Sequence, residues 1–443
     1  MRHKSSLFRG AALGALIALG IGGAAAQAKT HRSSAASSEA ARIQALEAQV
    51  QALTDRLNAQ AASQQQTQAT AQAAAQTAQA AQAQADDGIK TIPAQVQSAV
   101  AALPKPKPGW EASTKISGRM YYDVSNISQK SNGVKQASNG TQFDIKRFYF
   151  GVDHKFNDIF SANLTTDFTY DSGVGATQVY LKKAYLEANL SPMLNIRLGS
   201  TDLPWVPFAE DMYGYRYVEN TLIDRTKFGT SADWGVHVKG GFPVGMATIS
   251  YAVSAVNGAG YKTPGIGTAN RGKGIDVEGR LSADVSNFTV AVGGYTGKLG
   301  KDKQGTVTFN TAERLDALAA YHNSRMRLGV EYFYASDWND VTNPGLTNSS
   351  EGISGFGSFQ FTKQWGVFGR YDWVKPKRDT TPALKDNYFN VGVSYSPAKI
   401  VDFALVYKRD KVDNGVIGTS NGNIGGSVSG TYDEVGLWSQ FRW

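Results

Sequence analysis

One stretch of the sequence, residues 201–232, concentrates charged groups that could act on passing ions. Its charged residues include Glu210, Asp211, Arg216, Glu219, Asp224, Arg225 and Lys227. Opposite charges across a narrow water path select ions by their field. The stretch also contains six aromatic residues that can pack: Trp205, Phe208, Tyr213, Tyr215, Tyr217 and Phe228. We predict a folded pore constriction in which Arg216, Arg225, Lys227, Glu210, Asp211 and Asp224 face the path. The alternative is an outer lid packed on its own aromatics.

Further bases lie on predicted strands, on the face that carries polar residues. The candidates for a pore wall are Arg119, Arg147, Arg197, Lys239, Arg280 and Arg370. Acids are interleaved with them, including Asp167, Glu187, Asp276, Glu278, Glu331 and Asp372. Paired arginines would hold phosphate in a bidentate way, whereas the acids repel the same ion. We therefore expect a weak to moderate anion preference and no high-affinity phosphate site.

The composition argues against several other classes of protein. Cysteine is absent, so there is no disulfide framework or cysteine nucleophile. The five histidines show no metal-ligand spacing and no serine and aspartate partner set, so we predict no enzyme, no metal and no cofactor. The net charge of +8 is not concentrated in the predicted barrel, so nucleic acid is not an expected partner.

The segments that must position these residues are strands with alternating faces. Sixteen are predicted: 113–125, 142–154, 159–170, 179–190, 194–200, 233–242, 246–256, 275–285, 288–297, 313–322, 325–335, 352–362, 365–375, 386–396, 400–410 and 431–443. Their connections alternate between short turns and long loops, the long ones being 126–141, 171–178, 201–232, 257–274, 298–312, 336–351, 376–385 and 411–430. This alternation is typical of a transmembrane antiparallel β-barrel with periplasmic turns and outer loops.

The faces of the strands indicate which side meets lipid. In 386–396, Phe389, Val391 and Val393 share one face, and the other is polar. The polar face is too rich in charge for a dry core, so we place it in a water-filled lumen and the apolar face in lipid. An even number of strands puts both barrel ends on the periplasmic side.

The N-terminal region differs in character. Residues 1–28 are typical of a signal peptide. Helix 39–60 carries the heptad seam Ile43, Leu46, Val50, Leu53 and Leu57, which favours self-association over packing as a single helix. An Ala/Gln-rich spacer follows. The predicted organisation is therefore a signal peptide (1–28), a periplasmic coiled-coil stem (29–102), a Pro-rich linker (103–112) and a barrel (113–443).

Three segments resemble a known family. They are KKAYLEANLSPMLNIRLGSTDLPWVPF (182–208), NTLIDRTKFG (220–229) and ISYAVSAVNGAG (249–260), and they are similar to the phosphate-selective porin O and P family of Gram-negative outer membranes. The resemblance implies a sixteen-stranded homotrimer in contact with outer-membrane lipid and lipopolysaccharide. It also implies an inward third outer loop and diffusion of phosphate or other small anions. Two alternatives stay open: a general or sugar-type porin, and a barrel that anchors a stem contacting peptidoglycan.

Overall fold

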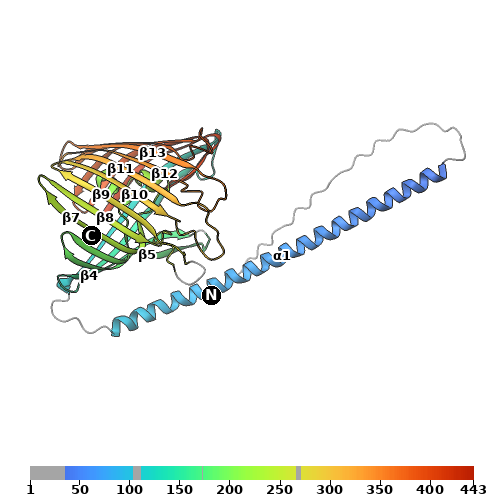
Figure 1. Ribbon diagram of the computed structural model, residues 1–443, viewed down its shortest axis with the longest axis horizontal. Helices are drawn as coiled ribbons and strands as arrows, with labels where there is room; N and C mark the ends of the chain where they lie inside the picture. The colour runs from blue at the N-terminus through green and yellow to red at the C-terminus, as the bar shows by residue number, and fades with distance from the viewer. Residues whose placement is uncertain (1–34, 103–110, 172, 266–270) are drawn as a thin grey trace, which may run out of the picture. The chain divides into compact units, whose positions relative to one another are not determined.

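The computed structural model describes residues 35–102, 111–171, 173–265 and 271–443 (Figure 1). The chain forms two compact units, Met1–Ala102 and Leu103–Trp443. The predicted signal peptide lies outside the described residues, as does most of the Pro-rich linker. No helix within the described ranges has a stretch both long and apolar enough to cross a membrane.

The first unit contains one helix, α1 (Ala35–Ala102), of 68 residues. The predicted helix 39–60 is present, and the Ala/Gln-rich stretch after it continues as helix, because alanine and glutamine have high helix propensity. The side chains described, 43–84, are all exposed. The five heptad residues are between 55 and 66% exposed, so the seam is unpartnered in the single chain.

The second unit is a closed antiparallel barrel of sixteen strands, as predicted. After a short 3-10 helix η1 (Glu111–Ser113), its strands are β1 (Thr114–Ser131), β3 (Gly140–Lys155), β4 (Phe160–Asp171), β5 (Ala176–Ser191), β6 (Leu194–Asp202), β7 (Ala232–Val244), β8 (Ala247–Val256), β9 (Asp276–Val285), β10 (Phe288–Gly297), β11 (Ala312–His322), β12 (Met326–Ser336), β13 (Ser349–Gln360), β14 (Trp365–Lys375), β15 (Lys385–Ala398), β16 (Val401–Thr419) and β17 (Gly422–Arg442). Each strand pairs with its neighbours along the chain, and β1 pairs with β17. A two-residue strand, β2 (Val134–Lys135), pairs beside β1 within the first connection.

The two ends of the barrel lie at the rim that carries the short turns. The amide of Gly118 donates to the carbonyl of Trp443 at 3.0 Å, and the amide of Trp443 returns a bond of 3.2 Å. The C-terminal strand is therefore paired on both sides, which removes an exposed edge. We call this the short-turn rim and the opposite one the long-loop rim.

Three of the predicted long loops are wrong in extent. β16 and β17 continue as a hairpin with Ser420 and Asn421 at the turn, so 411–430 is strand rather than loop. β4 and β5 extend into 171–178, and β1 extends to Ser131. The apolar residues of these stretches do not alternate regularly with polar ones, which is the pattern by which a strand is recognised in a sequence. Backbone pairing with the neighbouring strand makes them strands all the same.

The faces of the strands follow the predicted alternation over most of the barrel. Outward residues such as Val391 and Leu405 are more than half exposed, while Asn390 and Asp410 on the same strands are buried. Trp438, which breaks the apolar pattern of the last strand, points inward over the ammonium group of Lys408, 4.2 Å from the ring centroid. The inner face therefore combines charge with aromatic rings, as a cation–π contact requires.

Candidate pore constriction

Residues 203–231 between β6 and β7 fold into the barrel, and we call them the inward segment. The segment contains α2 (Val206–Tyr213) and α3 (Leu222–Arg225). A proline in the first turn of α2 and Gly214 in a left-handed conformation (φ 79°) after it give this helix a defined start and end. The two ends of the inward segment are joined by a hydrogen bond from the amide of Leu203 to the carbonyl of Ser231.

Apolar side chains fix the inward segment against the inner faces of strands. Trp205, Leu222, Ile223 and Phe228 are at most 1% exposed and belong to one buried cluster with residues of β10, β11, β12 and β14. A second cluster stacks the Tyr215 ring on Phe368, with centroids 3.9 Å apart. Burial of this kind excludes an outer lid packed only on its own aromatics.

Polar groups of the wall satisfy the backbone of the inward segment. The indole of Trp205 donates to Glu331, and its amide donates to Glu278, both at 2.9 Å. Arg314 donates to the carbonyl of Phe228 at 2.6 Å, and Arg370 donates to that of Asn220. Buried backbone groups need such partners, so these wall residues serve to hold the segment. We call the inner faces of β9–β16 the anchoring wall.

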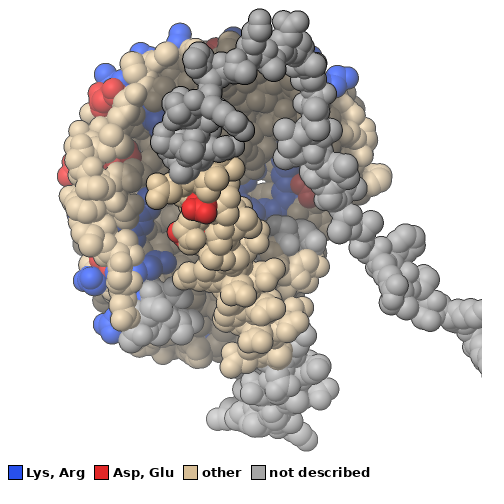
Figure 2. Space-filling model, turned by 90° about the vertical axis from the view of Figure 1, so that its right-hand side faces the viewer, with Lys and Arg blue, Asp and Glu red and all other residues tan. Residues whose placement is uncertain are grey.

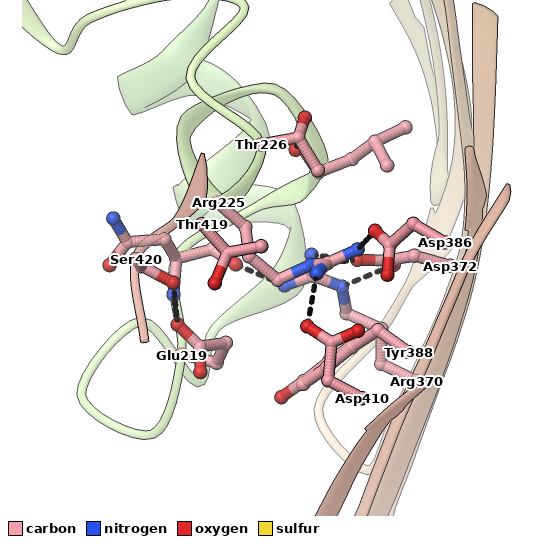
Figure 3. A network of polar contacts seen from close by, with 12 residues as sticks. Glu219, Arg225, Thr226, Arg370, Asp372, Asp386, Tyr388, Asp410, Thr419 and Ser420 are labelled. Carbon is pink, nitrogen blue, oxygen red and sulfur yellow. Dashed lines mark hydrogen bonds and ion pairs between the residues drawn. The ribbon is translucent and has the colours of Figure 1, made fainter. Parts of the chain in front are cut away.

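Arg225 makes the most extensive contact with the anchoring wall (Figure 3). Its Nε donates to Asp372 at 2.8 Å, one terminal nitrogen donates to Asp410 at 2.9 Å, and the other donates to Asp386 at 2.7 Å. The three carboxylates come from the consecutive strands β14, β16 and β15. The guanidinium also lies over the Tyr388 ring, 4.4 Å from its centroid.

The placement of Arg225 corrects the prediction that it faces the ion path. Its side chain is completely buried, and all three guanidinium nitrogens are bound by carboxylates. Arg280 and Arg370, predicted as pore wall, also belong to the anchoring wall, because Arg280 donates to the carbonyl of Pro204 at 3.0 Å and Arg370 binds Asn220. Lys227 stays exposed and lines a cavity of about 310 Å³ on the long-loop side of the segment.

Glu219 is a second anchor that sequence reasoning did not single out. It accepts bonds from Ser420 and Asn421 at the β16–β17 turn, at 2.8 and 2.9 Å, and lies 3.5 Å from the ammonium group of Lys408. Burial alone would raise the pKa of Glu219, but the charges of Lys408 and Lys146 and these two bonds outweigh it and hold that pKa well below its usual value. The Glu219 carboxylate is therefore ionised while the inward segment is bound to the anchoring wall.

Three of the predicted constriction residues form one cluster on the opposite surface of the inward segment. Arg216 binds Glu210 through its Nε and lies 3.4 Å from Asp224. All three side chains are between 13 and 18% exposed. Asp224 is close enough to Arg147 of β3 and Lys182 of β5 to interact with them electrostatically. The segment thus presents two acids and one base toward the half of the barrel that does not hold it.

That other half, the inner faces of β3–β7, carries bases that the inward segment does not cover, and we call it the open wall. Arg147 lies 3.7 Å from Asp167, and Arg197 binds Glu187 at 2.6 Å. Exposed Lys239 and Asp211 line a cavity of about 220 Å³ with Arg197. Arg119 is exposed near the short-turn rim. The barrel is hollowed in the space-filling view, and charged side chains are visible on its inner surface (Figure 2).

Two β-bulges add lysines to the inner surface that alternation alone assigns to the outside. Tyr121 pairs with Arg147 and Tyr122 with Ile145, so Lys146 is the extra residue of β3. Thr165 pairs with Lys183 and Thr166 with Leu181, so Lys182 is the extra residue of β5. A bulge turns two successive side chains to one face. Accordingly Lys146 lies over the buried ring of Trp438, and Lys182 lies over the partly buried ring of Tyr149.

The comparisons with known proteins bear on the fold. No family model and no curated protein matches the sequence. Among solved structures, an anion-selective porin from Comamonas acidovorans matches with a TM-score of 0.52 and 13% identity, over 74% of this chain and 99% of that one. OmpT, an outer membrane protein of Vibrio cholerae, matches with a TM-score of 0.50 and 16% identity, over 74% and 97%. This chain therefore has the barrel fold of Gram-negative outer-membrane porins.

Proposed function

We propose that the protein is a porin of a Gram-negative outer membrane through which small hydrophilic solutes diffuse passively. The observation that carries the proposal is the inward segment, which is fixed to one wall and leaves a charged water path along the other. A barrel wall with exposed apolar residues outside and charge inside suits a lipid surround and a wet lumen. The long-loop rim then faces outward, toward lipopolysaccharide, and the short-turn rim faces the periplasm.

The open wall supports a weak to moderate preference for anions. Arg147 on β3 and Lys183 on β5 keep 24 and 26% of their side chains exposed. The acids Glu210 and Asp224 of the inward segment stand across the path from this wall and limit the preference, because they repel anions. Ions that pass between the two surfaces come within a few ångströms of these charges, a distance at which salt screens the interaction only weakly. Phosphate or another small anion is the expected solute, consistent with the sequence resemblance to phosphate-selective porins.

A porin without selectivity is the second candidate, and the pairing of the bases favours it. Arg147 has Asp167 beside it, Lys183 binds Asp202, and Arg197 binds Glu187. A base beside a carboxylate attracts an anion less strongly than a free one. The two candidates differ in the sign and size of the reversal potential under a salt gradient.

The test is a planar-bilayer measurement of that reversal potential for the unaltered protein and for the double variant R147E/K183E. If the protein prefers anions, the reversal potential has the sign expected for anion flow, and in the variant it shifts toward the sign expected for cation flow. The matched control is K155E, at the short-turn rim, where the side chain is 59% exposed and far from the constriction. An unaltered protein that shows no preference would leave the non-selective porin as the function.

We also propose a homotrimer joined in part by the N-terminal stem. The support is the unpartnered seam of Ile43, Leu46, Val50, Leu53 and Leu57 on a long exposed helix, which is stable in water chiefly when it associates. Light scattering of the full chain in detergent tests this, since a monomer at high concentration contradicts it.

The domain organisation that we propose has four parts. Residues 1–28 are the signal peptide, and residues 29–102 are the periplasmic stem, which could also contact peptidoglycan. Residues 103–112 are the linker to the barrel at 113–443.

A further inference from the structure

The anchoring site around Arg225 contains more negative than positive charge. Two guanidinium groups, Arg225 and Arg370, meet three carboxylates, Asp372, Asp386 and Asp410. All five residues are at most 4% exposed. If every group were ionised, the site would bury one uncompensated negative charge, which is strongly unfavourable in a protein interior.

The neighbouring charged groups do not neutralise this excess. Lys408 of β16 is engaged by Glu219 and Glu434, and Asp224 of α3 lies beside Arg216. On β12 the Glu331 carboxyl accepts from Trp205, and on β15 the Tyr388 ring packs against both guanidinium groups. The site must balance its own charge.

The hydrogen bonds show where the imbalance lies. Asp372 is fully used, because its Oδ1 accepts from Arg370 and its Oδ2 accepts from Arg370 and Arg225. Asp386 and Asp410 each use Oδ2 for Arg225. Their Oδ1 atoms are buried and have no donor among the residues that the structure describes. An ionised carboxylate can only accept, whereas a protonated one supplies the missing donor.

We propose that Asp386 and Asp410 bind one proton between them, and that this proton helps to hold the inward segment on β14–β16. One bound proton brings the count to two positive and two negative charges. It also gives a hydroxyl that can donate to the carboxylate opposite. Both acids bind the same guanidinium group, so their carboxyl groups lie side by side and one proton can serve both. The proposal is independent of the solute that passes.

The sign of the pH dependence follows from linkage. Exposed to water, both carboxyls are ionised at neutral pH, so docking of the segment takes up a proton. Docking is therefore favoured as the pH falls and is weakened as the pH rises, until the proton leaves the docked site. Removal of one acid abolishes this dependence.

Infrared difference spectroscopy of the full-length protein at neutral pH tests the proton directly. D386N and D410N should each lose the C=O band of a protonated carboxylic acid and keep the ionised carboxylate bands. D433N is the matched control, because Asp433 pairs with Arg409 outside this site, and it should lose carboxylate absorption instead. If D386N and D410N both lose carboxylate absorption and no carboxylic acid band, the two aspartates are ionised and the proposal is wrong.

A second measurement does not require the D410N variant to fold. Bilayer current of the unaltered protein should become noisier from neutral to alkaline pH, as the segment loosens, whereas D386N should give the same trace throughout. A current from the unaltered protein that does not respond to pH would overturn the link between the proton and docking.

Discussion

The two walls of this barrel use the same residue types for different ends. On the anchoring wall, Arg370 and Asp372 are buried and bound to the inward segment or to its arginine. On the open wall, Arg197 and Glu187 form a similar pair, but both side chains are 17% exposed, and the described hydrogen bonds of Arg197 run to the wall itself. A charged residue inside a barrel is therefore a candidate for contact with solutes only if it is not buried by, and bonded to, another part of the chain.

The difference between the two walls arises from one feature, the inward segment. The inward segment needs partners for its backbone and its buried arginine, and it finds them on β9–β16. Burying a charge is tolerated only where opposite charges and hydrogen bonds surround it, so the anchoring wall is rich in matched groups. The bases of the open wall are also paired, but the pairs Lys183–Asp202 and Arg197–Glu187 keep between 17 and 32% of their side chains exposed to water.

The largest expected effect is from replacing Arg225 with leucine, which leaves three buried carboxylates without their shared partner. Breaking a buried ionic contact costs about 3–5 kcal/mol, and we expect the inward segment to detach and the single-channel conductance to rise. The control is R409L, because Arg409 lies next to Asp410 on β16 but pairs with Asp433 of β17 and is 40% exposed. Equal conductance of R225L and the unaltered protein would show that the segment does not depend on this anchor.

A smaller effect is expected at Glu219. Its pKa is depressed in the folded protein, so its stabilising contribution is present above the ordinary value of 4.5 and is lost as the pH falls below it. E219Q should lower barrel stability by about 1.5–3 kcal/mol at neutral pH, with a difference from the unaltered protein that shrinks in acid. Thermal unfolding at several pH values measures this, and E111Q, at an exposed glutamate of η1, serves as the control. A gap that widens in acid would reverse the assigned sign.

On the open wall the expected loss of stability is smaller still. Lys183 and Asp202 are 26 and 32% exposed, and a pair that reaches solvent contributes at most about 1 kcal/mol. K183Q should therefore leave the unfolding temperature nearly unchanged, while it reduces any anion preference in the bilayer. A large drop in stability would place Lys183 with the anchoring residues and blur the distinction between the walls.

The smallest effect is expected from the stem. Deletion of 39–102 removes α1 almost entirely but touches neither wall. We expect the reversal potential per barrel to stay the same, while the fraction of trimer seen by light scattering falls. A changed reversal potential would mean that the stem contributes to the path, and an unchanged trimer would make the barrel walls the main interface.

The barrel could be predicted from the sequence alone. Period-two apolar faces and the alternation of turns and loops depend only on local spacing, so sixteen strands could be counted before their pairing was known. The same spacing located the inward segment, because a connection of that length with so many aromatic residues has to pack somewhere. Polar extensions such as the β16–β17 hairpin were missed, since they are held by backbone pairing and lack an apolar face.

Which charged side chains are free to meet a solute depends on tertiary contacts. Arg225 and Arg216 are nine residues apart in one segment, yet one is completely buried among three aspartates and the other faces the open wall. Lys146 and Lys182 reach the interior through bulges, where one extra residue reverses the side that alternation predicts. Both outcomes depend on strands far away in the sequence, because a charge is buried or exposed by its spatial neighbours and not by its own spacing.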